Sequence, residues 1–275
     1  MLVDGAETLM PLFDEIVTWV RQFVGERDLM VSRIVDVGSG PGVGTAALAD
    51  SFPNADLVAA DASDNMLAAA AGRFSERPDR RLSTVKVDLS GELHALREVD
   101  LIWASLVLHH IGDETSTMRR LGGQLTPNGL LVVVEFGNDM SFLPADGGPE
   151  SLFAQRLAAA GKEWIAEMRA GLPDATSSSD YPTMIADAGL QLLGERLIET
   201  EFVPPLSDGA RRVVLGHLQR ARPLVAARMT GEDVEALDAL IDRENPRGVM
   251  RRGDLHLRDS RRVFVVAKRS SDVAG

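Results

Sequence analysis

The sequence predicts an α/β fold in which strands and helices alternate to build a doubly wound, mostly parallel sheet. The first observation is that short apolar runs recur along the first half of the chain, about 25–30 residues apart, with helix-compatible segments between them. The second is that these runs are apolar almost throughout, as strands buried on both faces are. The third is a turn directly after the first run, with glycines at positions 38, 40, 42 and 44.

The first half of the chain begins with an amphipathic helix and continues with five strands. Apolar residues recur at helical spacing over 6–25, which predicts a helix before the first strand. The strand-like runs are residues 34–37, 57–60, 84–87, 101–104 and 130–136. Helices are expected between the strands, near 42–51, 64–75 and 113–125.

After residue 136 the regular alternation of strand-like and helix-like segments ends. Glycine, aspartate and proline over 137–150 indicate a loop, and helical spacing returns over 151–170. A second loop follows at 176–180, where Asp180 is suited to cap a helix that runs to Ala188. The remaining expected elements are a strand over 191–202, a helical insertion over 208–243 broken at Pro223, and a last strand over 262–268.

We expect a single domain over residues 1–275, organised around a ligand-binding core. The expected parts are an N-terminal helical segment at 1–29, the core at 30–137, helical insertions at 138–182 and 204–250, and closing strands at 183–203 and 251–269. The insertions are candidates for a lid over a bound ligand, because long helical insertions commonly close over ligands. Aromatic and methionine side chains that such a lid could use, or that could equally belong to the core, are Trp19, Phe142, Phe153, Trp164, Met168 and Tyr181.

Composition and charge narrow the class of protein. Hydrophobic residues make up 45% of the 275 residues, enough for a sizeable core, and the absence of cysteine rules out disulfides and thiolate chemistry. A formal net charge of −12 argues against a nucleic-acid or membrane partner, because phosphate affinity needs excess lysine and arginine. The N-terminal residues lack a basic leader and no apolar run could span a bilayer, so we expect a cytoplasmic protein. The histidines show no metal-ligand spacing, and we expect no metal site.

The glycine-rich turn brings bare backbone and a helix N-terminus up against a ligand. A dinucleotide-binding fingerprint would place glycines at the first, third and sixth positions, but the sixth position is Val43. Glycines alternate instead, at 38, 40 and 42. The turn resembles the first motif of the class I S-adenosylmethionine-dependent methyltransferases, in which Asp36 is the acid that precedes the loop.

Two later segments strengthen this resemblance to the small-molecule group of that superfamily. Residues 100–111, which include Leu108, His109 and His110, look like its fourth-strand motif. Residues 125–135 resemble its fifth-strand entry, a Pro-x-Gly turn before an apolar strand. The resemblance covers about residues 30–137 closely and 180–269 loosely, and it implies a Rossmann-like, seven-stranded, mostly parallel sheet with a last antiparallel strand and helical substrate-side insertions.

Asp61 closes the second strand, 23 residues after Gly38, where an acid can accept hydrogen bonds from both ribose hydroxyls of a nucleoside. Its other possible role, capping the next helix, is better suited to Ser63 or Asp64. A nicotinamide cofactor would use Asp61 in the same way, so this residue does not separate the two ligands.

The resemblance supplies further cofactor contacts. Asp88 would take the adenine amino group while the amide of Leu89 meets a ring nitrogen, unless Asp88 is only a solvated loop acid. Met66 would pack near adenine, although core packing also explains it. The implied cofactor-binding residues are Asp36, Gly38, Ser39, Gly40, Gly42, Asp61, Ala62, Met66, Asp88, Leu89 and Ser105.

Candidate acid–base residues follow the fourth strand, and candidate anion-binding residues lie in the C-terminal stretch. His109 and His110 are candidate catalytic residues, because an imidazole can remove a proton near neutral pH, although packing or hydrogen bonding also explains them. Glu135 closes the fifth strand, where a structural role is as good an explanation as a substrate contact. Residues 243–269 hold nine Arg and Lys against three acids, which indicates either a face balanced by acidic neighbours or a grip on a carboxylate-bearing substrate.

The function that the resemblance implies is methyl transfer from S-adenosylmethionine to an oxygen, nitrogen or carbon atom of a small-molecule metabolite, leaving S-adenosylhomocysteine. Catalysis would come mainly from proximity and orientation, and the protein would be a monomer or a homodimer. Two alternatives stay open: an NAD-dependent oxidoreductase, and a binding or assembly protein without catalysis on the same fold.

Overall fold

The computed structural model describes residues 6–75, 77, 79–145, 147–175 and 180–269. Most of the loop expected at 176–180 lies outside the described residues. Seven strands form one sheet in the order β3-β2-β1-β4-β5-β7-β6. They are β1 (Arg33–Val37), β2 (Asp56–Asp61), β3 (Leu82–Lys86), β4 (Val99–Ser105), β5 (Leu125–Phe136), β6 (Leu190–Phe202) and β7 (Leu257–Lys268).

The directions of the strands confirm the predicted fold class. Strands β3, β2, β1, β4 and β5 pair in parallel, and β7 pairs antiparallel with β5. The central strands are buried on both faces, which accounts for their apolar sequences. Near the start of β4, Asp100 accepts hydrogen bonds from the amides of Ser32 and Arg33 at 2.9 and 3.0 Å and so holds β4 beside β1.

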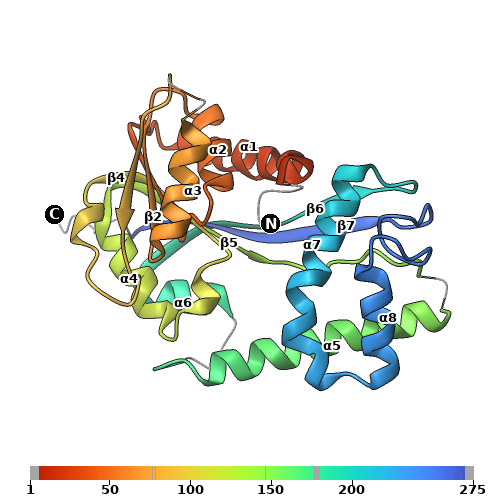
Figure 1. Ribbon diagram of the computed structural model, residues 1–275. Coiled ribbons are helices and arrows are strands. Elements are labelled where there is room, and N and C mark those ends of the chain that lie inside the picture. Colours follow the sequence, from red (N-terminus) through yellow and green to blue (C-terminus); the bar gives the residue numbers. More distant parts are fainter. Residues whose placement is uncertain (1–5, 76, 78, 146, 176–179, 270–275) are drawn as a thin grey trace. The chain divides into compact units, whose positions relative to one another are not determined.

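Eight α-helices are described along the chain (Figure 1). They are α1 (Met10–Glu26), α2 (Val43–Ser51), α3 (Asp64–Phe74), α4 (Glu114–Gln124), α5 (Pro149–Ala170), α6 (Tyr181–Asp187), α7 (Asp208–Val225) and α8 (Gly231–Ile241). Asp180 caps α6 as predicted, since its carboxylate accepts from the amide of Thr183. None of the described helices is both long enough and apolar enough to cross a bilayer.

Several predicted boundaries are wrong. The strands predicted to begin at 130 and 262 begin earlier, at Leu125 and Leu257. The third strand ends at Lys86, so Asp88 lies beyond it in a loop. The helical insertion is not broken at Pro223, which lies inside α7; the chain leaves the helix only after Val225 and resumes as α8. A proline removes one backbone hydrogen bond, and the burial of Val225 at the end of α7 is consistent with packing that offsets this loss.

The chain divides into two compact units. One comprises residues 13–136, 172–198 and 261–275, and its core packs α4 and α6 against strands β1, β4 and β5. The other comprises residues 1–12, 137–171 and 199–260, and its core is made chiefly by α5, α7 and α8 (Figure 1). The prediction of a single domain with these segments as insertions stays a prediction.

Candidate functional site

The candidate site lies at the carboxyl ends of β1 and β4, at the point where the order of the sheet reverses. From β1 the chain crosses to β2 on one side, and β4 then adds on the other side of β1. In open α/β sheets, ligands bind in the crevice at such a switch point. Two loops meet there: the glycine loop, residues 38–42, and the segment 106–110 that follows β4.

The glycine loop is shaped by left-handed backbone. Gly38 has φ +65°, and a Cβ built there would lie 2.3 Å from Cγ2 of Val107, so the two loops touch and only glycine fits. Gly40 has φ +52°, but a Cβ built there would meet nothing within 4 Å. Gly42 is the left-handed N-cap of α2. The loop therefore presents exposed backbone at Gly40 beside a helix N-terminus.

Asp61 ties the end of β2 to this loop. Its Oδ2 accepts a hydrogen bond from the amide of Gly40 at 2.9 Å, and its Oδ1 accepts from the amide of Ser63 at 2.8 Å. Ser63 caps α3, with its hydroxyl accepting from the amide of Met66 at 3.4 Å. Because Ser63 serves as the cap, the carboxylate of Asp61 stays at the edge of the sheet, half-buried, with lone pairs left for a ligand.

Asp36 is a buried carboxyl group beneath the glycine loop. Burial raises its pKa from 3.8 to about 7, helped by the nearby charge of Asp61 and opposed by a hydrogen bond from the Thr45 hydroxyl at 2.6 Å. Trp103 is its register partner on β4. A Cβ built on Gly44 would lie 3.4 Å from Asp36 Oδ2 and 3.5 Å from Trp103 Nε1, so glycine keeps space open beside both groups.

Two buried polar atoms of the site have no hydrogen-bond partner within the described part of the chain. They are the Ser39 hydroxyl, in the glycine loop, and the indole nitrogen of Trp103. Buried polar groups are usually hydrogen-bonded, and the exceptions call for an explanation such as a bound ligand or water. The Ser39 hydroxyl and the Trp103 indole nitrogen are therefore available to hydrogen-bond to a polar ligand.

The loop after β3 carries Asp88 and Leu89. Asp88 is exposed, and its Oδ1 accepts from the amide and hydroxyl of Ser90 at 2.8 and 2.7 Å, which lowers the pKa of its carboxyl group. Arg120 on α4 donates to the carbonyl oxygens of Leu89 and Gly91 and so anchors the loop. This anchor was not predicted, because nothing in the sequence links Arg120 to a loop some 30 residues earlier.

The remaining predicted cofactor residues lie along the same carboxyl edge. Ala62 is exposed between Asp61 and the α3 cap, and Met66 is half-buried in the first turn of α3. Ser105 is the last residue of β4, paired with Val134 of β5. All eleven residues thus fall on β1, β2 and β4 or on the segments that follow β1, β2 and β3.

The half-buried His109 and the buried Glu135 form a polar pair next to these loops. His109 Nδ1 lies 2.7 Å from Glu135 Oε2, and the amide of Leu108 donates to Glu135 Oε1 at 3.2 Å. The rings of His110 and Phe136 lie 4.1 and 5.1 Å from the His109 ring. Burial and the neighbouring His109 lower the pKa of His110, and Glu135 opposes that shift.

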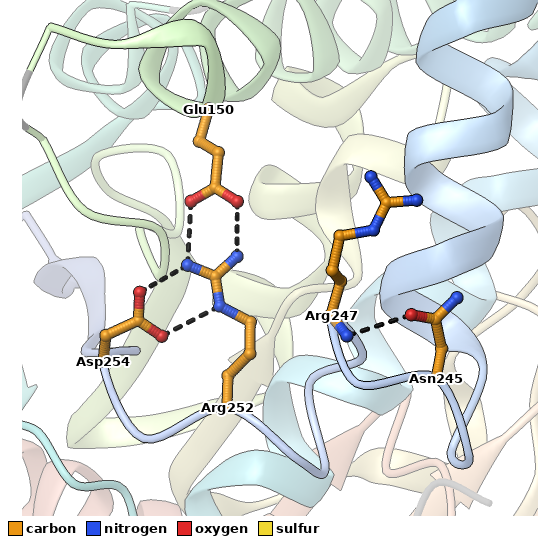
Figure 2. Close-up of polar contacts among 5 residues, drawn as sticks. All are labelled: Glu150, Asn245, Arg247, Arg252 and Asp254. Carbon is orange, nitrogen blue, oxygen red and sulfur yellow. Dashed lines mark hydrogen bonds and ion pairs between the residues drawn. The ribbon is translucent and has the colours of Figure 1, made fainter.

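Within the described part of the chain, four of the nine basic residues in the C-terminal stretch pair with acids. Arg252 is 11% exposed at its side chain and is held between Glu150, at 2.6 and 2.8 Å, and Asp254, at 2.9 and 2.5 Å (Figure 2). Further pairs are Arg251–Glu244, Arg258–Glu201 and Arg262–Glu195. Arg247 is exposed, and its backbone amide donates to Asn245 Oδ1 at 2.9 Å (Figure 2). These contacts favour the interpretation of the stretch as a face balanced by acidic neighbours.

Three of the aromatic lid candidates are buried. Phe142 and Phe153 belong to the core formed chiefly by α5, α7 and α8. Tyr181 stacks on Phe264 and donates a hydrogen bond to the buried Glu114 at 3.1 Å. These contacts are those of core residues, and the lid stays a prediction.

The site combines a glycine loop after β1, the acid Asp61 at the end of β2, and the pair of His109 and Glu135 near the ends of β4 and β5. These features are typical of an α/β protein with a ligand site at the switch point of its sheet. Residues 35–131 match the family model described as "Methyltransferase domain". The matched segment is about a third of the chain and contains the glycine loop, Asp61 and Asp88, so this part of the chain is similar to that family.

Curated relatives match a little over a third of the chain. A trans-aconitate 2-methyltransferase from Methylobacterium radiotolerans is 36% identical over 99 residues, which are 36% of this chain and 36% of that protein. A malonyl-[acyl-carrier protein] O-methyltransferase from Halalkalibacterium halodurans is 33% identical over 107 residues, 38% of this chain and 40% of that protein. The chain therefore matches less than half the length of either relative.

Solved structures extend the likeness to nearly the whole fold. A methyltransferase-like protein from Bacillus halodurans covers 91% of this chain and 98% of its own, with a TM-score of 0.55 and 15% identity. The plantazolicin methyltransferase in complex with S-adenosylhomocysteine covers 97% of this chain and 87% of its own, with a TM-score of 0.50 and 12% identity. At such identities the likeness concerns the fold alone.

Proposed function

We propose that this chain is a methyltransferase that binds S-adenosylmethionine at the glycine loop and acts on a small-molecule acceptor. The observation that carries the proposal is the left-handed glycine loop, open at Gly40 and hydrogen-bonded to the Asp61 carboxylate. The unpartnered hydroxyl of Ser39 in the same loop supports it, because a polar ligand would satisfy this buried atom.

Each residue of the site would hold a different part of the cofactor. Asp61 would accept hydrogen bonds from the ribose hydroxyls, and the loop of Asp88 and Leu89, with Met66, would hold the adenine. Gly38, Gly40 and Gly42 would let the cofactor approach the backbone, while Asp36, Ser39 and Ser105 would face its amino-acid end. When bound, S-adenosylmethionine supplies an electrophilic methyl group on a sulfonium sulfur.

The main task of the protein is to hold an acceptor atom in line with that methyl group. Fixing two reactants in a productive geometry can lower a barrier by about 7–11 kcal/mol, whereas an acid–base residue contributes about 10²- to 10⁴-fold in rate. Orientation by the loops therefore matters more than proton transfer by His109 or His110. The alternative of a nicotinamide cofactor has less support, because Val43 already begins α2 where a dinucleotide loop needs glycine.

The acceptor does not follow from the relatives. The names of two of them specify trans-aconitate and a malonyl group on a carrier protein, but the matches cover only 36% and 40% of those proteins. The small-molecule class of acceptor rests on the resemblance of segments 100–111 and 125–135 to the small-molecule methyltransferases.

The test is calorimetric titration of the protein with S-adenosylhomocysteine and, separately, with NAD. We expect the wild type to bind S-adenosylhomocysteine and not NAD, and Gly40→Val to abolish this binding because its side chain would occupy the open side of the loop. Gly189→Val is the matched control, since Gly189 also has left-handed backbone (φ +77°) and a Cβ there also meets nothing within 4 Å. Near-normal affinity in Gly40→Val would refute the assignment of the site.

Catalysis is tested separately from binding. A wild type that binds S-adenosylhomocysteine should form it from S-adenosylmethionine when a suitable acceptor from a metabolite library is added. Binding with no turnover across the library would favour the alternative of a protein that keeps the cofactor site without catalysis.

A further inference from the structure

We propose that Glu135 positions His109 as the proton acceptor of this site, and that the methyl acceptor is a hydroxyl group on a ring-bearing molecule rather than a carboxylate. This inference rests on the proposed methyltransferase function and names its class of substrate. His109 is the catalytic residue in this proposal, and Glu135 is a positioning residue that acts through it.

The hydrogen bonds of Glu135 select one tautomer of His109. Glu135 is 5% exposed and acceptor-only when ionised, with Oε1 taking the amide of Leu108 and Oε2 lying 2.7 Å from His109 Nδ1. A carboxylate at that distance requires the hydrogen on Nδ1. The neutral ring therefore carries its lone pair on Nε2, as a general base must.

The pair is placed beside the proposed cofactor loop by two neighbouring strands. His109 lies two residues after Val107, whose side chain is in contact with Gly38, and the amide of His110 donates to the Val107 carbonyl at 3.1 Å. Glu135 lies on β5, which pairs with β4 directly before this segment. His109 therefore lies next to the glycine loop, near the same switch point of the sheet.

A base is needed only for some acceptors. A carboxylate reaches the site already deprotonated, whereas a hydroxyl group must lose its proton as it takes the methyl group. In that step the oxygen–carbon bond forms, the carbon–sulfur pair stays on sulfur, the oxygen–hydrogen pair stays on oxygen, and the proton passes to Nε2 of His109. The buried charge of Glu135 stabilises the resulting imidazolium and would repel a carboxylate acceptor.

The surroundings of the pair favour a ring-bearing acceptor. Phe136 is 53% exposed, its ring lies 5.1 Å from that of His109, and the Arg261 guanidinium lies 5.9 Å from its centre. An exposed aromatic face next to the base can stack on a planar substrate. Among the described residues, Glu135 on β5 and His110 contact His109, and Arg261 on β7 lies over the Phe136 ring. Arg262 is the register partner of Glu135, and its side chain pairs with Glu195.

The first experiment needs no substrate. Long-range ¹H–¹⁵N spectra of the histidine-labelled protein, titrated upward until the rings are neutral, report which nitrogen carries the proton; His109→Gln assigns the signal. We expect the His109 hydrogen on Nδ1 in the wild type and a mixture of tautomers in Glu135→Leu. Glu26→Gln on α1 is the control and should leave the hydrogen of His109 on Nδ1. A wild-type ring protonated on Nε2 alone would overturn the proposal.

The second experiment compares acceptors in matched pairs, each a phenol and the carboxylic acid on the same ring. We expect turnover of phenols only, a loss of kcat of about 10²- to 10⁴-fold in His109→Gln, and a smaller loss in Glu135→Gln, with affinity for S-adenosylhomocysteine unchanged. Methylation of the carboxylates, or a phenol rate that His109→Gln leaves intact, would overturn this inference alone. Failure of the wild type to bind S-adenosylhomocysteine would instead overturn the proposed function.

Discussion

The glycine-loop site and the cluster around Arg252 both gather carboxylates and hydrogen-bond donors, but they satisfy them differently. Around Arg252 all three nitrogens of the guanidinium donate hydrogen bonds, to Glu150 on one edge and to Asp254 on the other (Figure 2). In the site, the Asp36 carboxyl group accepts from the Thr45 hydroxyl, and the Ser39 hydroxyl is buried with no hydrogen-bond partner among the described residues.

The pKa shifts of carboxyl groups in the two regions run in opposite directions because their main causes differ. The hydrogen bonds of Arg252 lower the pKa of Asp254, whereas burial without a cation raises the pKa of Asp36 to about 7. A saturated cluster stabilises the fold, while polar groups left without partners cost stability and remain available to a ligand. This difference, rather than the number of charged residues, separates a structural cluster from a candidate site.

The largest expected effect is on the pH dependence of stability in Asp36→Asn. The folded protein binds a proton at Asp36 more tightly than the unfolded chain, so Asp36 makes the wild type lose stability as pH rises from about 4 to about 7. At about 1.4 kcal/mol for each pKa unit, the loss amounts to a few kcal/mol. Urea unfolding at pH 4.5 to 8 should show that the neutral amide removes this slope, and parallel curves for the two proteins would contradict the raised pKa.

Asp61→Asn should weaken cofactor binding by about 10- to 100-fold, because hydrogen bonds to a charged group contribute about 1.5–3 kcal/mol. The amide nitrogen of Asn would also face one of the two backbone amides that now donate to Asp61. Calorimetry with S-adenosylhomocysteine measures the effect. Asp64→Asn, which changes an exposed acid paired with Lys86, is the control and should bind normally.

Arg252→Met should destabilise the protein by about 1–2 kcal/mol and leave cofactor affinity unchanged. The guanidinium is buried while its two carboxylate partners are about half exposed, so the loss should exceed that of an ordinary surface ion pair. The measurement is the free energy of unfolding in urea at pH 7. A change in S-adenosylhomocysteine affinity as large as that of Asp61→Asn would show that the two regions are not as different as proposed.

The smallest expected effect has two opposite parts. Ser39→Ala removes a buried hydroxyl without a partner, so the ligand-free protein should gain up to about 1 kcal/mol of stability. If the hydroxyl serves the cofactor, affinity for S-adenosylhomocysteine should fall by up to about tenfold. A variant that loses stability while keeping its affinity would indicate that the hydroxyl is part of the scaffold.

Much of the fold could be predicted because its signals are local. The apolar runs, the glycine turn and the caps at Ser63 and Asp180 each act within a few residues, and each appears in the structure. The break predicted at Pro223 was wrong because it followed the local rule that proline ends a helix, whereas in the structure α7 continues through Pro223 to Val225. The end of the third strand was set one residue too late for a similar reason, since apolar Val87 is buried in the loop just beyond it.

The sequence by itself determined the order of the elements and the residues at the carboxyl edge of the sheet, because hydrophobic periodicity and turn chemistry are written in neighbouring residues. Only the tertiary structure decided which side chains face one another. Glu135 and His109 are 26 residues apart, and Arg252 and Glu150 are 102 apart. Such pairs depend on strand register and loop packing. These bring together residues that are far apart in the sequence, which no local sequence pattern can predict.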